Sequence, residues 1–139
     1  MQQIELEYDR WLEEQIEILR QGRFENLDVA NLIEELSALG RAEKSAVKSL
    51  VYQILLHLLL IDYWKEESDY NKNHWLAEVN AFQIQLEDKL TVNLTKLAED
   101  NLSRLYAKAR KNAVRKSGLP VERFPDLCPY TLEDIKDRG

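Results

Sequence analysis

The chain has 139 residues, of which 45% are hydrophobic and 32% are charged. This length is typical of one domain and supplies enough apolar side chains for one core, so we expect a single helical domain over residues 1–139. The 25 acidic and 19 basic residues give a formal charge of -6, which weighs against binding dominated by nucleic-acid phosphate. Because Cys128 is the only cysteine, an intrachain disulfide and a cysteine-rich zinc site are both excluded.

The sequence also argues against targeting and membrane insertion. The first residues carry several acidic groups and no basic-then-apolar pattern, so a secretory signal is not expected. The longest apolar run, residues 50–61, is shorter than the roughly 20 residues that a spanning helix needs. We therefore expect a cytoplasmic protein without a membrane partner.

The first predicted helix covers about residues 4–21. Its apolar side chains recur at helical spacing, which places Tyr8 and Trp11 in the core. Gly22 follows at the position where a left-handed residue commonly ends a helix.

A glycine also separates the next two predicted helices. Residues 28–39 have one apolar stripe, with Asp28 as the N-terminal cap and Gly40 as the C-terminal stop. The third helix, residues 42–65, is apolar on nearly every side after residue 50. It is therefore expected to be the central helix.

The second half of the chain continues the helical pattern after one gap. Residues 66–72 are polar and without periodicity, which predicts a loop, and Asn73 can cap the helix that follows. Apolar residues then recur at spacings of three and four up to about residue 118. The weaker helix formers at residues 91–95 leave open whether this stretch is one helix or two.

The C-terminal segment is expected to be irregular before one last short helix. Pro120, Pro125 and Pro129 each disfavour helix in the preceding residue. Thr131 and Asp134 have the spacing of a capping box.

These elements predict an all-α fold. We expect a single compact bundle of about five helices, with the bundle core at about residues 4–118. The proline-containing segment and a short C-terminal helix occupy residues 119–139.

His57 lies inside the apolar run, where a neutral imidazole needs a hydrogen-bond partner in place of water. It is either a core histidine or, with Glu34, Glu35 or Glu43, part of a metal site. Fourteen helical residues separate Glu43 from His57 by about 20 Å, so such a site would need a second subunit. The chain also lacks the Glu-x-x-His sequence of di-iron bundles, and we assign no cofactor.

Asn31, Glu35 and Glu43 recur at spacings of four and eight. They are either solvated surface or, with His57, a polar recognition site. Since no catalytic constellation can be assembled, we do not expect an enzyme, and no catalytic residue is assigned.

The strongest charge pattern is a basic stripe opposite the apolar side of the last long helix. Arg104, Lys108, Lys111 and Arg115 repeat at four, three and four. Solvent exposure explains such a stripe, and docking to an acidic partner, including the acidic first helix of another copy, is the alternative. Nucleic acid is not favoured because base-stacking aromatics do not interleave with the stripe.

Four sequence features occur together. They are the segments LRQGRFENLDVANLIEELSALGRAEKSAVKS, LLHLL and SGLPVERFPDLCPYTLEDI, and a helix led by Trp75. In this combination the chain resembles domain-of-unknown-function family 29 from about residue 8 to residue 135. The resemblance implies an all-helical, cytosolic, mainly cyanobacterial protein and no particular activity. Members often carry a basic residue soon after LLHLL, where this chain has Leu60 and Ile61, which weighs against a positive charge beside His57.

Three functions remain to be compared. The first is a non-enzymatic interaction module, expected to be a homo-oligomer with a further protein partner still unidentified. The second is a metal-dependent enzyme or sensor with an intersubunit site of Glu and His side chains. The third is weak nucleic-acid binding through the basic stripe, which would depend steeply on salt.

Overall fold

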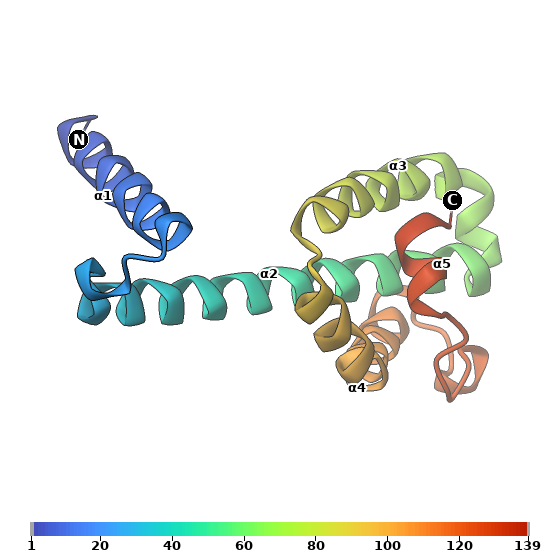
Figure 1. Ribbon diagram of the computed structural model, residues 1–139. Helices are drawn as coiled ribbons and strands as arrows, with labels where there is room; N and C mark the ends of the chain where they lie inside the picture. The colour runs from blue at the N-terminus through green and yellow to red at the C-terminus, as the bar shows by residue number, and fades with distance from the viewer. Residues whose placement is uncertain (1, 139) are drawn as a thin grey trace. The chain divides into compact units, whose positions relative to one another are not determined.

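The computed structural model describes residues 2–138, with side chains from residue 7 onward (Figure 1). Its helices are α1 (Gln2–Gln21), η1 (Phe24–Asn26), α2 (Val29–Tyr63), α3 (Lys65–Lys89), α4 (Val92–Ser117), η2 (Val121–Arg123) and α5 (Leu132–Asp137). No strand occurs in this part of the chain. The predicted all-α fold is therefore confirmed.

The chain divides into two compact units, Met1–Arg41 and Ala42–Gly139, which we call unit 1 and unit 2. Unit 1 contains α1, η1 and the beginning of α2. Unit 2 contains the rest of α2 and all later elements. Whether the whole chain folds as one cooperative domain stays a prediction.

The predicted stop at Gly40 is wrong, because α2 continues through this residue. Gly22 and Gly118 adopt the positive φ of a helix-ending glycine, at 71° and 70°, whereas Gly40 does not. A glycine inside a helix costs only about 1 kcal/mol relative to alanine. The neighbouring alanine, leucine, arginine, glutamate and lysine residues favour helix strongly enough to continue the helix past it.

The predicted loop at residues 66–72 is also wrong, since α3 begins at Lys65. Glu66 and Glu67 lie in its first turn, where acidic side chains interact favourably with the helix dipole. Consequently Asn73 lies inside the helix and does not cap it. A solvated stretch of helix needs little apolar periodicity, which is why the sequence pattern predicted the later part of α3 but missed its beginning.

The sequence left open whether the chain forms one helix or two between about residues 73 and 118, and the structure has two, α3 and α4. The chain is extended at Leu90 and Thr91, and the Thr91 hydroxyl accepts a hydrogen bond from the Leu94 amide at 3.2 Å. This N-terminal cap starts α4, and Gly118 ends it in the left-handed conformation.

In unit 2, α3, α4 and α5 surround the C-terminal part of α2 (Figure 1). Val51, Ile54 and Leu55 of α2 are fully buried, as expected of the central helix. Trp64 and Trp75 stack with ring centroids 6.0 Å apart at the edge of this core. Burial of this kind is the main source of stability for the unit.

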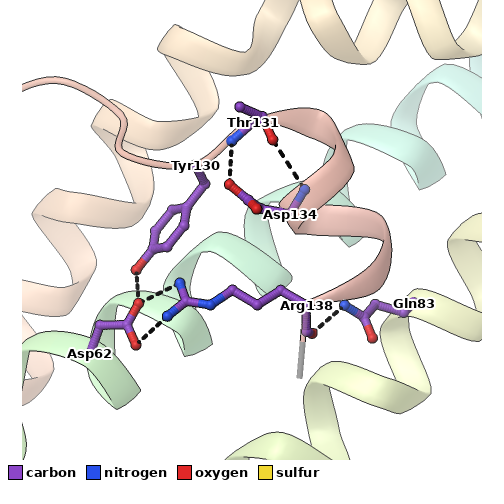
Figure 2. A network of polar contacts seen from close by, with 6 residues as sticks. All are labelled: Asp62, Gln83, Tyr130, Thr131, Asp134 and Arg138. Carbon is purple, nitrogen blue, oxygen red and sulfur yellow. Dashed lines mark hydrogen bonds and ion pairs between the residues drawn. The ribbon is translucent and has the colours of Figure 1, made fainter.

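The predicted capping box of the C-terminal helix is confirmed in α5. Thr131 and Asp134 each accept a hydrogen bond from the backbone amide of the other (Figure 2). Beyond the helix, the Arg138 guanidinium binds both oxygens of Asp62 at 2.6 and 3.0 Å. The Tyr130 hydroxyl donates to the same carboxylate at 2.7 Å, so Asp62 of α2 anchors both ends of α5.

In unit 1, polar contacts join α1 to the start of α2. The Trp11 indole donates to the Asp28 carboxylate at 3.0 Å, and Gln15, which is buried, accepts from the Asp28 amide at 2.9 Å. Tyr8 is 44% exposed, so its predicted place in the core is wrong. Its hydroxyl reaches a surface carboxylate of α2, which keeps the ring at the edge of the contact.

One helix in the described part of the chain, α2, is long and apolar enough to cross a membrane by length and composition. Of its most apolar window, 56% is buried inside the protein. Length and composition are weak evidence for a membrane span, because the core helix of a soluble protein meets the same criteria.

Candidate functional site

An open hollow of about 340 Å³ lies in unit 1, between α1 and the beginning of α2. We call it the acidic hollow, and its lining residues are Glu7, Tyr8, Trp11, Asn31, Glu34 and Glu35. Two aromatic rings and three carboxylates thus share one small surface. This combination suits a cationic group, which is attracted both by the negative charge and by the faces of the rings.

Hydrogen bonds hold the aromatic side chains of the acidic hollow in place. The Tyr8 hydroxyl donates to the Glu35 carboxylate at 2.7 Å. The Trp11 indole and the Asn31 amide both donate to one oxygen of Asp28, at 3.0 and 2.8 Å. The two ring centroids are 6.2 Å apart, with planes tilted by 35°.

These hydrogen bonds also shift the pKa of two of the groups that they join. The bond to Glu35 raises the pKa of Tyr8. The hydrogen bonds from Asn31 and Trp11 lower the pKa of Asp28, so its carboxylate remains ionised to lower pH.

The predicted polar site is divided between separate surroundings. Asn31 and Glu35 line the acidic hollow in unit 1. Glu43, in unit 2, forms an ion pair with Lys89 of α3 at 3.5 Å. His57, also in unit 2, has its Nδ1 2.7 Å from the Gln53 carbonyl oxygen.

His57 is half-buried on α2. Its ring packs at an angle against Phe82, with centroids 5.6 Å apart. The Gln53 carbonyl accepts from Nδ1, which assigns the proton to that nitrogen. Among the residues that the structure describes, no three His, Cys, Asp or Glu side chains are grouped to hold a metal ion.

The basic stripe, Arg104, Lys108, Lys111 and Arg115, is exposed along its whole length. None of the four residues has an ion-pair partner within the described part of the chain. Arg110, which is off the stripe, instead pairs with Asp126 at 3.6 Å and donates to the carbonyls of Val121 and Phe124. The stripe therefore has no structural role within its own unit comparable to that of Arg110.

A second hollow, of about 460 Å³, borders the basic stripe in unit 2. Lys111 and Arg115 line it, together with Arg110 and Asp126. Its apolar lining residues are Ala107, Val114 and Val121. A partner surface bound by the stripe would therefore meet apolar as well as charged groups.

The sequence reasoning did not identify Glu7, Tyr8 and Trp11 as members of one site with Glu34 and Glu35. It placed both aromatic residues in the core because their spacing is helical. The available signal was the mixture of acidic and aromatic residues in ELEYDRW, which is unusual for a core-facing stripe.

Unit 1 also exposes a set of large apolar side chains. We call this set the apolar face, and it comprises Ile16, Leu19, Phe24, Val29, Ile33, Leu36 and Leu39. Their exposed fractions range from 45% to 63%. Helical periodicity places Val29, Ile33 and Leu36 on one side of α2.

The fold and these surfaces define an all-helical protein with one well-packed unit and one unit rich in exposed apolar and acidic groups. The model of the family described as "domain of unknown function DUF29" matches residues 5–139. The chain belongs to this family, as its resemblance predicted. Neither the curated proteins nor the solved structures contain a match to the chain.

Proposed function

We propose that this protein is a non-enzymatic interaction module that forms homo-oligomers through the apolar face of unit 1. The observation that supports this function is the exposure of seven large apolar side chains between residues 16 and 39. Exposed apolar side chains on one side of a helix, such as Val29, Ile33 and Leu36, are a common feature of protein–protein interfaces. Covering this surface removes apolar area from water. The removal stabilises the complex by roughly 25 cal/mol per Å², before the costs of association are subtracted.

A second copy of the same face is the partner that we propose. Two copies that pair through this face bury the same surface on each copy, as in a symmetric dimer. Helical periodicity turns Glu34 and Glu35 at least about 100° away from Val29, Ile33 and Leu36. Self-pairing through the apolar face would therefore keep these carboxylates out of the centre of the interface.

The test is light scattering after size exclusion, from about 1 to about 100 µM protein. The wild type is expected to be a dimer or larger. The double variant Ile33→Gln and Leu36→Gln keeps the charge and the helix propensity but removes apolar contact, so it should be a monomer. A matched control, Ile84→Gln and Val92→Gln, changes two exposed apolar residues of unit 2 and should associate like the wild type.

Two results would contradict the proposal. One is a wild type that stays monomeric over the whole range. The other is a face variant that associates as strongly as the control. Elemental analysis of the same chromatographic peak tests the alternative of a metal site between subunits. Stoichiometric metal in the wild type that is lost in Glu43→Gln or His57→Gln would favour this metal site over the interaction module.

A further inference from the structure

We infer that the basic stripe of one copy docks on the acidic hollow of a second copy. The inference rests on the proposed self-association and adds a second pair of contacting surfaces to it. It is carried by the complementary charge of the two surfaces and by the absence of ion-pair partners for the stripe within the described residues.

The formal charge of the chain is distributed very unevenly. Ten acidic and four basic residues lie in unit 1, so this unit alone accounts for the charge of -6. The 15 acidic and 15 basic residues of unit 2 cancel. A neutral unit that presents an exposed basic stripe is thus joined in one chain to an acidic unit, and association between copies can bring opposite charges together.

The basic stripe has the geometry of a docking surface. With 3.6 residues per turn, its four side chains leave α4 within about 60° of one another. The stripe is also next to the second hollow, where Ala107, Val114 and Val121 provide apolar contact. Charged groups around an apolar centre are the usual arrangement of a protein interface.

The acidic hollow has the chemistry to receive these side chains. Glu7 and Glu34 have no ion-pair partner among the described residues, so both carboxylates are available. The rings of Tyr8 and Trp11 border the same space, and aromatic rings attract ammonium and guanidinium groups. An arginine or lysine of the stripe would gain both interactions at one place.

Nucleic acid is the competing partner for the stripe, and the structure favours a protein. No aromatic side chain lies among the residues that line the hollow beside the stripe. Single-stranded nucleic acid is usually held by stacking on such rings. Asp126 lines the same hollow and would repel a phosphate chain.

The experiment measures the self-association constant of the full chain by sedimentation equilibrium. One variant reverses the stripe with Lys108→Glu and Lys111→Glu, and a second reverses the hollow with Glu7→Lys and Glu34→Lys. Each should raise the dissociation constant about tenfold, because like charges would then face one another. The combined quadruple variant restores opposite charges and should return to within about threefold of the wild type.

A matched control keeps the charge change but moves it off the stripe. Lys96→Glu with Lys116→Glu alters two exposed lysines of α4, and both lie about 80° or more from the position of Arg104 around the helix. This control should self-associate nearly as well as the wild type. Circular dichroism of every variant verifies that the helices are intact.

Three outcomes would overturn the inference. If stripe reversal leaves the dissociation constant unchanged while Ile33→Gln with Leu36→Gln still dissociates the protein, the proposed function stands and the docking of the stripe fails. If the quadruple variant is not restored, the stripe and the hollow are not partners. If the stripe variant loses only binding to a labelled single-stranded oligonucleotide, with unchanged self-association, the stripe is a nucleic-acid surface.

Discussion

Unit 2 buries its apolar side chains, whereas unit 1 displays them. Among the described side chains, Ile18 is the one buried hydrophobic residue of unit 1, and all the others belong to unit 2. Eight of the thirteen exposed large hydrophobic residues lie in unit 1, although it is much the smaller unit. Unit 2 therefore has a core of its own, while unit 1 keeps much of its apolar surface available for a partner.

The two units also differ in what holds their helices together. In unit 1, hydrogen bonds that Tyr8 and Trp11 donate, and one that Gln15 accepts, join α1 to Glu35 of α2 and to Asp28 just before it. The net contribution of a hydrogen bond to stability is modest, because the same groups bond to water on unfolding. The comparison suggests four measurements, which differ in the size of the effect expected.

The largest effect is expected from truncation in the core of unit 2. Ile54 is fully buried, so Ile54→Ala should lower the free energy of unfolding by about 2–5 kcal/mol. Ile33 is 62% exposed, so in dilute monomer Ile33→Ala should change the free energy of unfolding by less than about 0.5 kcal/mol. Urea unfolding followed by circular dichroism measures both, and equal effects would remove the distinction between the units.

A smaller effect is expected at the polar anchor of α5. Asp62→Ala leaves the Tyr130 hydroxyl and the Arg138 guanidinium without their acceptor, at a cost of about 1–3 kcal/mol. The exposed Asp69 is the matched control, and Asp69→Ala should be nearly neutral. Hydrogen exchange of α5 reports on the local effect, and unchanged protection in Asp62→Ala would contradict the anchoring role.

Two glycines, one inside α2 and one at the end of α4, test the assigned helix geometry with effects of opposite sign. A Cβ added at Gly40 meets no atom within 4 Å, so Gly40→Ala should stabilise the helix by about 0.5–1 kcal/mol. Gly118 has a φ of +70°, so Gly118→Ala should destabilise the protein by about 1 kcal/mol. If Gly40→Ala proved destabilising in thermal unfolding, a helix end at this glycine would be the better description.

The smallest effects concern the dependence of stability on pH. Unit 1 should lose stability in acid, and unit 2 should lose stability in alkali. The pKa of Asp28 is lowered on folding, so its contribution to unit 1 is present above pH 4 and is lost as the pH falls through the folded value. Burial raises the pKa of Tyr106 to about 12, so its contribution to unit 2 is complete below pH 10 and is lost as the pH rises through about 12.

Phenolate absorbance and tryptophan fluorescence during pH titration follow these two transitions. Tyr106→Phe should remove one late-titrating phenol, and Asp28→Asn should flatten the acid response of unit 1. A Tyr106 phenol that ionised near the ordinary tyrosine pKa of about 10 would contradict the assigned burial.

Local signals in the sequence predicted several elements well. Gly22 and Gly118 ended helices as expected, and Thr131 with Asp134 formed the capping box. Each of these features depends on the backbone conformation or hydrogen bonding of a few consecutive residues, which is why a short motif reveals it. Gly40 and residues 66–72 were misread because the propensity of the surrounding residues outweighed a single local signal.

The candidate site was predictable only in part. Asn31 and Glu35 were recognised as members of one polar stripe, and the basic stripe was identified by its four residues. The hydrogen bonds of Tyr8 to Glu35 and of Trp11 to Asp28 could not be anticipated, because they depend on how α1 meets the beginning of α2. Helical spacing alone does not say whether an apolar stripe is buried or left exposed.

The sequence by itself determined the helical class, the central apolar helix, the helix ends at Gly22 and Gly118, and the family. These properties follow from periodicity, backbone propensity and recognisable motifs along the chain. The structure was needed to show that local helix propensity carries α2 through Gly40, and the tertiary structure alone decided that unit 1 leaves its apolar side chains exposed. It also decided that Asp62 holds α5 through Tyr130 and Arg138, because contacts between residues far apart in sequence form only when the helices pack.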